Sequence, residues 1–478
     1  MQLFFLPLFF FLCGIVVGGI WSWAGVFVIL CSMLIFFCYH SSSRWLSIVM
    51  LCIGYALSYL SMMQYKLERD RIGESVAWGA FTQSASGVAW WLVSTSEFTY
   101  RYRVTVTEID DVMVTPFDVA LILPPNLSLV PGDNVRALGK FSFPRDTPEY
   151  RAEKQLWYRG MIGEFRSFQV QKYPPEQYTL LVRAREWFDR QLSLIFPPRG
   201  YDILSGILLG QKNTFDTEFR EQLKASWLMH IMVVSGSNVM MLIVFLSLFL
   251  RGLFPWWRIV VVTSVVFSFA FLVWGDAPVW RAALMGILGY SASLWWYRIG
   301  ALMLPLFVAA LLALLNPLSL VYDIGLQLSF FSVICIIVFS ASFTKYFRFL
   351  WHFFDEAFGL TLAATLGTLP LTLFYFGTFS LIGPLANLFA APAVPILMYS
   401  GILTLGVSIF SYKLAVIIGY IPWLTATYLE RVIIFFGSQR WSLLTLDLHQ
   451  SQEYMIVSLV VLIVFILRFS VSKKSWTL

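Results

Sequence analysis

The sequence predicts a polytopic α-helical membrane protein with a small external β-barrel domain of the OB-like kind. Three observations predict this fold class. The chain of 478 residues is 59% hydrophobic and 13% charged, which is far more apolar than an average soluble domain. Its apolar runs are mostly long enough to cross a bilayer as helices. One long polar insert, residues 64–200, interrupts them and contains segments with the period of β-strands.

The apolar runs predict about twelve transmembrane helices, some of them discontinuous. The first run lacks the basic start of a cleaved signal peptide, so we expect it to be retained. The predicted spans are residues 3–20, 23–39, 45–63, 230–250, 258–275, 279–297, 300–315, 320–341, 357–376, 384–410, 414–436 and 455–471. They divide the chain into N-terminal helices (1–63), an external β domain (64–175), amphipathic interfacial helices (176–229) and a C-terminal transmembrane domain (230–478).

Lys and Arg in the short connections predict the orientation, because cytoplasmic loops are enriched in these residues. With a cytoplasmic N-terminus, alternating spans place Arg251, Arg258, Lys345 and Lys413 on the cytoplasmic side, together with the C-terminus. The insert 64–200 then lies outside. In a bacterium this describes a multi-pass protein of the cytoplasmic (inner) membrane. The cysteines all lie inside apolar runs, which excludes a disulfide in the insert.

The external insert predicts a small barrel followed by an amphipathic segment. About five short strands are expected, among them segments starting at Phe98 and runs at 112–123, 133–141 and 161–170. OB-folds use such barrels to hold oligonucleotides, although other small β modules fit the same spacing. Residues 178–197 then carry apolar side chains on one helical face. This segment would lie flat at the membrane interface or cover the barrel as a lid.

Strongly polar residues inside the predicted spans are candidate functional residues, because they are costly in lipid and face the interior or a water-filled path. They are His230, Ser235 to Asn238, Asp276 with Arg281, Asp323 with Gln327, and Asn387. Ser235-Gly236-Ser237-Asn238 predicts a broken helix, whose second half near Asn238 and Val239 would present free N–H groups to an anion. Alternatively, the small residues there serve only close helix packing.

Four ordered blocks resemble the ComEC family of competence proteins. The first runs from Leu204 to Leu242, and is similar to a GLLLGD segment followed by HLLAVSGxHV. The others begin at Arg281 (RAALM), Asn316 (NPLSLVYDIGLQLS) and Leu369, which leads to Pro384-Leu385-Ala386-Asn387 and Pro392. The insert adds Leu123 to Val135, Gly139-Lys140-Phe141 and Trp157 to Ile162, which are similar to the family's extracellular domain.

The resemblance implies a channel that carries single-stranded DNA across the cytoplasmic membrane during natural transformation. A separate DNA receptor, nuclease and cytoplasmic motor ATPase are its implied partners. The residues expected to line the channel or guide phosphates are Ser235, Gly236, Ser237, Asn238, Arg281, Asp323, Gln327 and Asn387. In the insert, the expected phosphate contacts are Arg101, Arg103, Arg136, Lys140 and Arg159, with Tyr100, Tyr102 and Trp157 for stacking. The insert is nearly neutral, so solvated strand faces are the alternative for these positions.

Two departures from the family pattern change what we expect. Asn238 stands where the pattern has His, so no titratable imidazole is available there, although an amide still donates hydrogen bonds. The chain ends at Leu478 without the metallo-β-lactamase-like domain that many members carry. The four histidines are scattered, and no cofactor, metal site, nucleotide loop or catalytic cluster is predicted, so we do not expect an enzyme. The alternative function is secondary transport of a small anionic solute or envelope lipid, since transporters also use broken helices.

Overall fold

The computed structural model describes residues 44–73, 82–95, 99–124, 127, 129–142, 156, 159–175, 178–211, 215–232, 234, 236–273, 277–295, 302–346, 352–439 and 442–445. The predicted spans 3–20, 23–39 and 455–471 lie outside these residues, as do Ser235 and Asp276.

The chain divides into two compact units. The first comprises Met1–Arg183 and Met303–Leu326, and the second comprises Ala184–Leu302 and Gln327–Leu478. The first unit contains α3 (Arg44–Gly73), β1 (Gln83–Thr95), β2 (Tyr100–Ile109), β3 (Val112–Leu123), β4 (Asn134–Ser142), β5 (Gly163–Tyr173), α12 (Met303–Leu315) and α13 (Ser319–Tyr322). The second contains most of α5 (Leu180–Ile195) and α14 (Ile324–Tyr346), with α6 (Pro198–Leu209), α7 (Thr217–Ala225), α8 (Met229–Met232), α9 (Gly236–Phe249), η1 (Leu250–Gly252), α10 (Pro255–Leu272), α11 (Ala277–Leu294), α15 (His352–Phe376), β6 (Thr378–Ser380), α16 (Gly383–Ala390), α17 (Ala393–Ser408), α18 (Tyr412–Gly437) and β7 (Leu443–Thr445).

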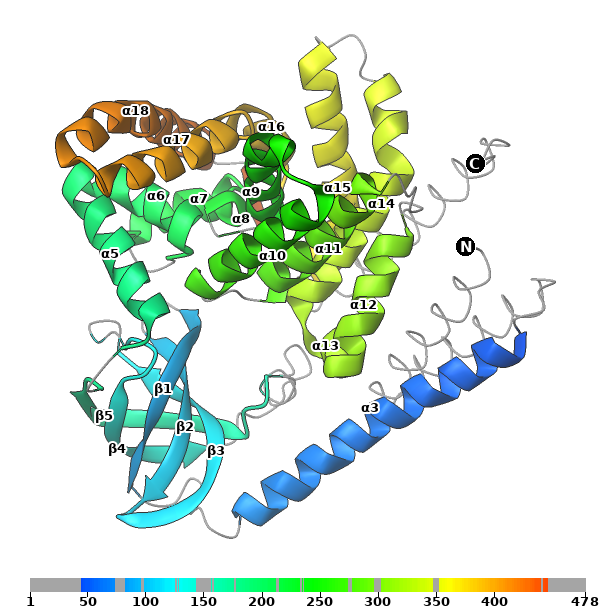
Figure 1. Ribbon diagram of the computed structural model, residues 1–478. Coiled ribbons are helices and arrows are strands. Elements are labelled where there is room, and N and C mark those ends of the chain that lie inside the picture. The colour runs from blue at the N-terminus through cyan, green and yellow to red at the C-terminus, as the bar shows by residue number, and fades with distance from the viewer. Residues whose placement is uncertain are drawn as a thin grey trace. The chain divides into compact units, whose positions relative to one another are not determined.

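Strands β1 to β5 close into a barrel in the order β1-β2-β3-β5-β4 (Figure 1). Strand β1 pairs antiparallel with both β2 and β4, whereas β3 and β5 are parallel. The five-stranded barrel predicted for the insert is therefore present, and its external position stays a prediction. Strand β1 was not predicted, because its inward positions are Gln83, Ala85, Gly87 and Ala89, which show no apolar alternation.

Two glycines allow the barrel to close. A Cβ at Gly87 of β1 would overlap the backbone oxygen of Thr105, and a Cβ at Gly139 of β4 would overlap the backbone oxygen of Arg166. Each glycine also lies at a shift in strand register. Such bulges sharpen the local twist and bend of a strand, which a small barrel requires at its corners.

Aromatic and branched side chains fill the barrel. The ring centres of Phe141 and Phe165 lie 4.4 Å apart, and the two ring planes are inclined at 53°. Tyr102 belongs to the same core and is 4% exposed. The stacking role predicted for Tyr102 is therefore wrong, because the inward side of its strand faces the core and not a solvent-borne base. Helix α3 is attached to this unit by Tyr65, whose hydroxyl donates to the carbonyl of Ile162 at 3.1 Å.

The Pro131-Gly132-Asp133 turn is held by a fully buried carboxylate. Asp133 accepts from the backbone N–H of Val130 at 2.6 Å and from the Tyr178 hydroxyl at 2.8 Å, and pairs with the Lys172 ammonium at 2.9 Å. Buried charges are stable only when paired and hydrogen-bonded in this way. This family-like motif therefore fixes the β4 end of the barrel.

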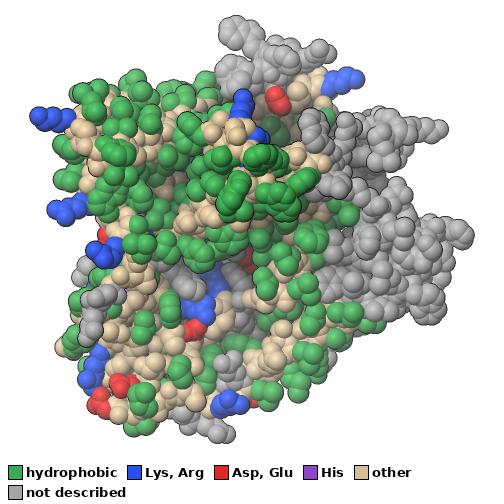
Figure 2. Space-filling model, in the orientation of Figure 1, with side chains coloured by type: hydrophobic (Ala, Val, Ile, Leu, Met, Phe, Trp, Pro, Cys, Tyr) green, Lys and Arg blue, Asp and Glu red, His purple; other side chains and the backbone are tan. Residues whose placement is uncertain are grey.

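The second unit is called the helical unit from here on. Many large apolar side chains are exposed on it, and they dominate its visible face (Figure 2). Among the described residues, α10, α14 and α15 contain segments long and apolar enough to cross a membrane, and the bent pair α16 and α17 adds a fourth if it counts as one span. Shorter apolar helices include Gly236–Gly252 and Met303–Leu315. These findings fit a membrane protein, while the predicted number of about twelve spans is not confirmed.

Helices α5 and α6 form a hairpin that packs into the helical core. Leu192 and Phe196, at the turn of the hairpin, belong to the main core cluster, and every residue from Ile203 to Leu209 is buried. Gly401 of α17 faces Leu204 and Leu208, where its lack of a side chain allows close approach. The interfacial position predicted for residues 176–229 stays a prediction, and α6 itself lies inside the helical packing.

Candidate functional site

The polar segment at residues 235–238 coincides with a break between two helices, as predicted. Helix α8 ends at Met232, Val234 is not helical, and α9 begins at Gly236. Gly236 faces α11, where an added Cβ would lie 3.2 Å from the Cβ of Ala282. The neighbouring Ser237 is exposed, and Asn238 is buried. The break therefore combines a close helix contact at Gly236 with the accessible hydroxyl of Ser237.

Asn238 reaches from this break to the end of α6. Its Nδ2 donates to the carbonyl oxygen of Ile207 at 3.1 Å, and the side chain is fully buried. Ile207 lies in the last turn of α6, where carbonyls lose their partners within the helix. The same helix end is closed by Gly210, which adopts a left-handed φ of 68°. Asn238 thus acts as a side-chain cap on a buried helix terminus.

Among the described residues, Arg281 is the largest fully buried side chain, at 1% exposure, and it lies on α11 directly before Ala282. Its neighbour in sequence therefore contacts Gly236, so the structure brings the first two family-like blocks together. The predicted partner of Arg281, Asp276, lies outside the described residues.

The remaining predicted channel residues make hydrogen bonds at other helices. Asp323 precedes α14 and its Oδ1 accepts from the backbone N–H of Leu326 at 3.1 Å, as an N-cap does. Gln327 accepts from the hydroxyl of Tyr375 at 2.8 Å, which joins α14 to α15. Asn387 of α16 donates to the Thr361 hydroxyl of α15 at 2.9 Å. Hydrogen bonds therefore link the third and fourth family-like blocks through α15.

The cations predicted to bind DNA on the barrel are largely engaged with carboxylates. Arg101 pairs with Glu164 at 3.2 Å, Arg103 with Asp118, and Arg136 with Asp111. Lys140 is half-buried on β4, and Arg159 lies in the turn before Gly160. Phosphate binding by the three paired arginines would compete with these ion pairs. Trp157, predicted to stack with bases, lies outside the described residues.

Trp90 is an exposed aromatic residue on the barrel that the sequence did not single out. It lies on β1, is 45% exposed, and donates from Nε1 to the Thr105 hydroxyl at 2.7 Å. Thr105 in turn donates to Asp118, which also accepts from Arg103. This chain of hydrogen bonds orients the indole on the outer face of β1 to β3. Recognising β1 as a strand would have drawn attention to Trp90.

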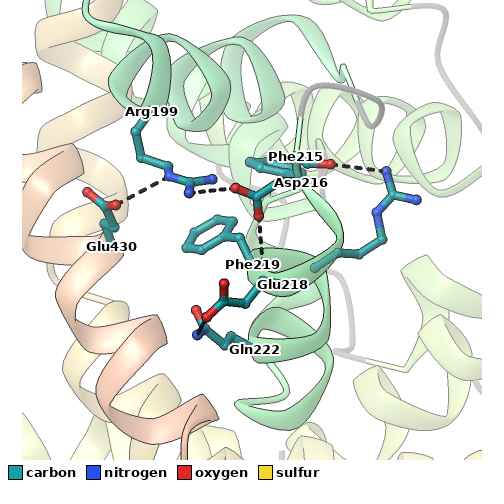
Figure 3. A network of polar contacts seen from close by, with 8 residues as sticks. Arg199, Phe215, Asp216, Glu218, Phe219, Gln222 and Glu430 are labelled. Carbon is teal, nitrogen blue, oxygen red and sulfur yellow. Dashed lines mark hydrogen bonds and ion pairs between the residues drawn. The ribbon is translucent and has the colours of Figure 1, made fainter. Parts of the chain in front are cut away.

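A second unpredicted polar network joins α6, α7 and α18 (Figure 3). Arg199 pairs with Asp216 at 2.8 Å and Glu430 at 3.3 Å, and its guanidinium lies 4.6 Å from the centre of the Phe219 ring. Asp216 also caps α7 by accepting from the Phe219 N–H at 2.8 Å. The hydrogen bond from Arg199 holds the pKa of the Asp216 carboxyl below its usual range. The capping pattern around Asp216 was the available sequence signal.

A third network lies at the open end of the α5–α6 hairpin. Asp189 accepts from the Tyr201 hydroxyl and from Gln211, both at 2.7 Å. Arg185 donates to the carbonyl of Leu272 at the end of α10, and burial lowers the pKa of Arg185 to about 10. Burial also raises the pKa of Tyr201, which favours its protonated, donating form. These bonds tie both arms of the hairpin together and attach it to α10.

Comparison with known proteins places this architecture in a family. A family model described as "Competence protein" matches residues 207–471. The matched range begins within α6 and includes the α8–α9 break, Arg281, Gln327 and Asn387. No curated protein and no solved structure matches the chain. Because the match covers more than half of the sequence, the chain belongs to the competence protein family, whose members take part in DNA uptake.

Proposed function

We propose that the protein is a channel for single-stranded DNA across the cytoplasmic membrane during natural transformation, and that it is not an enzyme. The observation that carries this proposal is the family match over the helical unit, combined with the five-stranded barrel that precedes it in the chain. Barrels of this kind serve as OB-folds that hold oligonucleotides. The helical unit supplies apolar helices interrupted by polar breaks, which are tolerated in lipid where they line a cavity or are buried in protein.

The barrel would receive the incoming strand. Because Arg101, Arg103 and Arg136 are paired with carboxylates, we assign the first contact to base stacking on the exposed Trp90. Stacking on aromatic side chains tolerates any sequence, as uptake of unselected DNA requires. Lys140 and Arg159 remain candidates for phosphate contacts. This assignment also fits the nearly neutral charge of the insert.

The helical unit would form the passage. The predicted channel residues that belong to this unit, Gly236, Ser237, Asn238, Arg281, Gln327 and Asn387, would line or shape it. The N-terminus of α9 carries the exposed Ser237 and the positive end of a helix dipole, which favour a phosphate nearby. Asn238 and Asn387 hydrogen-bond to neighbouring helices and would shape the passage.

Contacts between connecting segments support the proposed multi-pass topology. Alternation of the predicted spans puts the α7–α8 turn and the segments after α15 and α18 on one side of the membrane. In the structure, the Ser380 hydroxyl donates to the Ala225 carbonyl at 3.0 Å, Gly383 packs on Trp227, and Gly437 packs on the backbone of Gln222. Strands β6 and β7 also pair with each other. Such contacts are expected if these connecting segments lie on the same side of the membrane.

The opposite side is proposed to be cytoplasmic. The α9–α10 turn exposes Phe254, Trp256 and Trp257 beside Arg251 and Arg258. Aromatic residues favour the membrane–water interface, and arginines favour its cytoplasmic side.

Three separate proteins are proposed as partners. A receptor would deliver the strand, a nuclease would degrade its complement, and a motor ATPase would pull it inward.

Deleting the gene and following labelled DNA tests the proposal. We expect surface-bound DNA to persist and DNA in the cytosol to disappear, and the intact gene should restore the cytosolic DNA. Normal entry into the cytosol would overturn the channel assignment.

The broken helices α8–α9 and α16–α17 also suit a secondary transporter of a small anionic solute or lipid. Loss of such a solute's uptake with unchanged DNA entry would favour that function.

A further inference from the structure

The C-terminal end of α6 and the N-terminal end of α9 meet inside the helical unit. Helix α6 has 12 residues and α9 has 14. At a rise of about 1.5 Å per residue, each is shorter than the roughly 30 Å thickness of a bilayer's hydrocarbon core. A Cβ at Gly206 of α6 would lie 2.7 Å from the carbonyl oxygen of Met232, the last residue of α8. The broken helix therefore lies directly against the end of α6.

Asn238 bonds these two helix ends together. Its Nδ2 donates to the Ile207 carbonyl at 3.1 Å, and the side chain has no exposed surface. The acceptor is a carbonyl in the last turn of a helix, so the group that meets it must be a donor. Full burial disfavours a charged group at this position.

We propose that Asn238 is a positioning residue that fixes the end of α6 against the α8–α9 break, and that position 238 requires a neutral hydrogen-bond donor. This role differs from binding phosphate, because the amide N–H is directed at protein backbone and is buried. It holds whichever solute passes the helical unit. It also explains how Asn stands where the family pattern has His, since a neutral imidazole likewise carries one N–H donor.

Hydrogen exchange of the full-length protein in detergent tests the proposal without relying on DNA transport. The reporting amides are Gly210 and Gln211, whose N–H groups bond to Gly206 and Ser205 at the end of α6. Asn238→Leu keeps a similar size and removes the donor, so we expect these amides to exchange about tenfold faster, as for the loss of one buried hydrogen bond. Asn238→His supplies an N–H and should stay within about twofold of the wild type.

Asn387→Leu is the matched control, because it removes another side-chain amide bond, to Thr361, and leaves α6 untouched. It should not change exchange at Gly210 and Gln211. Unchanged exchange in Asn238→Leu would overturn the positioning role. Exchange in Asn238→His as fast as in Asn238→Leu would overturn the donor requirement. Neither result depends on whether the protein conducts DNA, so the proposed function stands or fails separately.

Discussion

The barrel and the helical unit supply their polar groups with hydrogen-bond and ion-pair partners in different ways. In the barrel, the backbone ladder closes on itself and several charged side chains pair on the outer faces of the strands, as Arg103 does with Asp118. In the helical unit, most backbone groups bond within their own helix, and polar side chains join one helix to another, as Asn238 of α9 does by donating to a carbonyl at the end of α6. The barrel's shape therefore depends on close backbone approach, and that of the helical unit on a few buried side-chain bonds.

Glycine substitution should give the largest difference between the two regions. Gly87→Ala places a Cβ against the Thr105 carbonyl in the barrel, whereas Gly406→Ala on α17 meets nothing within 4 Å. We expect Gly87→Ala to lower the free energy of unfolding by more than about 3 kcal/mol, since backbone cannot move aside cheaply. Gly406→Ala should be neutral or stabilise by up to about 1 kcal/mol through helix propensity. Thermal unfolding and protease resistance of the full-length protein measure both, and equal effects would refute the distinction.

Carboxylate removal sharpens the comparison within the barrel. Asp133→Ala leaves the Val130 N–H, the Tyr178 hydroxyl and Lys172 without their buried acceptor, so we expect a loss of about 3 kcal/mol. Asp111→Asn removes the charge from the exposed pair with Arg136, tolerates the positive φ of 64° at this position, and should cost about 0.5 kcal/mol or less. Chemical denaturation monitored by tryptophan fluorescence measures both. A similar cost for the two variants would mean that burial does not decide the strength of these pairs.

A double-mutant cycle tests the side-chain bonds of the helical unit. Tyr375→Phe and Gln327→Leu each remove one end of the 2.8 Å hydrogen bond between α15 and α14. We expect a coupling energy of about 0.6–1.7 kcal/mol, the range for hydrogen bonds between helices in membranes. Unfolding of the single and double variants in detergent gives this energy. Additive losses would show that the bond does not join the helices.

The smallest expected effect is a pH dependence at Asp216. Because Arg199 lowers the folded-state pKa of this carboxyl, its contribution to stability is present above the unfolded-state value of about 4 and is lost as pH falls through the lowered folded-state value. The side chain is 56% exposed, so solvent screening keeps the effect small. Asp216→Asn keeps a capping oxygen and removes the titration. Its melting temperature should therefore change less than that of the wild type between pH 5 and 3.

The sequence predicted those features that leave a periodic or compositional trace. Alternating residues after Phe98 gave the later barrel strands, and Ser235 to Asn238 gave the helix break. Strand β1 was not predicted, because Gly87 and Ala89 occupy inward positions and leave no apolar alternation. The partners of Asn238, Gln327 and Asn387 were not predicted either, since each bond joins segments that are distant in sequence. Pairing of Arg101 and Arg103 with carboxylates depended on strand register, which composition does not contain.

Photo-crosslinking of an incoming labelled strand tests the channel proposal most directly. A crosslinking amino acid would replace Trp90 on the barrel, Ser237 at the α8–α9 break, or Ile417 on the exposed apolar face of α18. We predict DNA adducts at positions 90 and 237 and none at 417, with the adduct at 90 forming first. Adducts at 90 alone, in cells where labelled DNA still reaches the cytosol, would contradict passage of the strand through the helical unit.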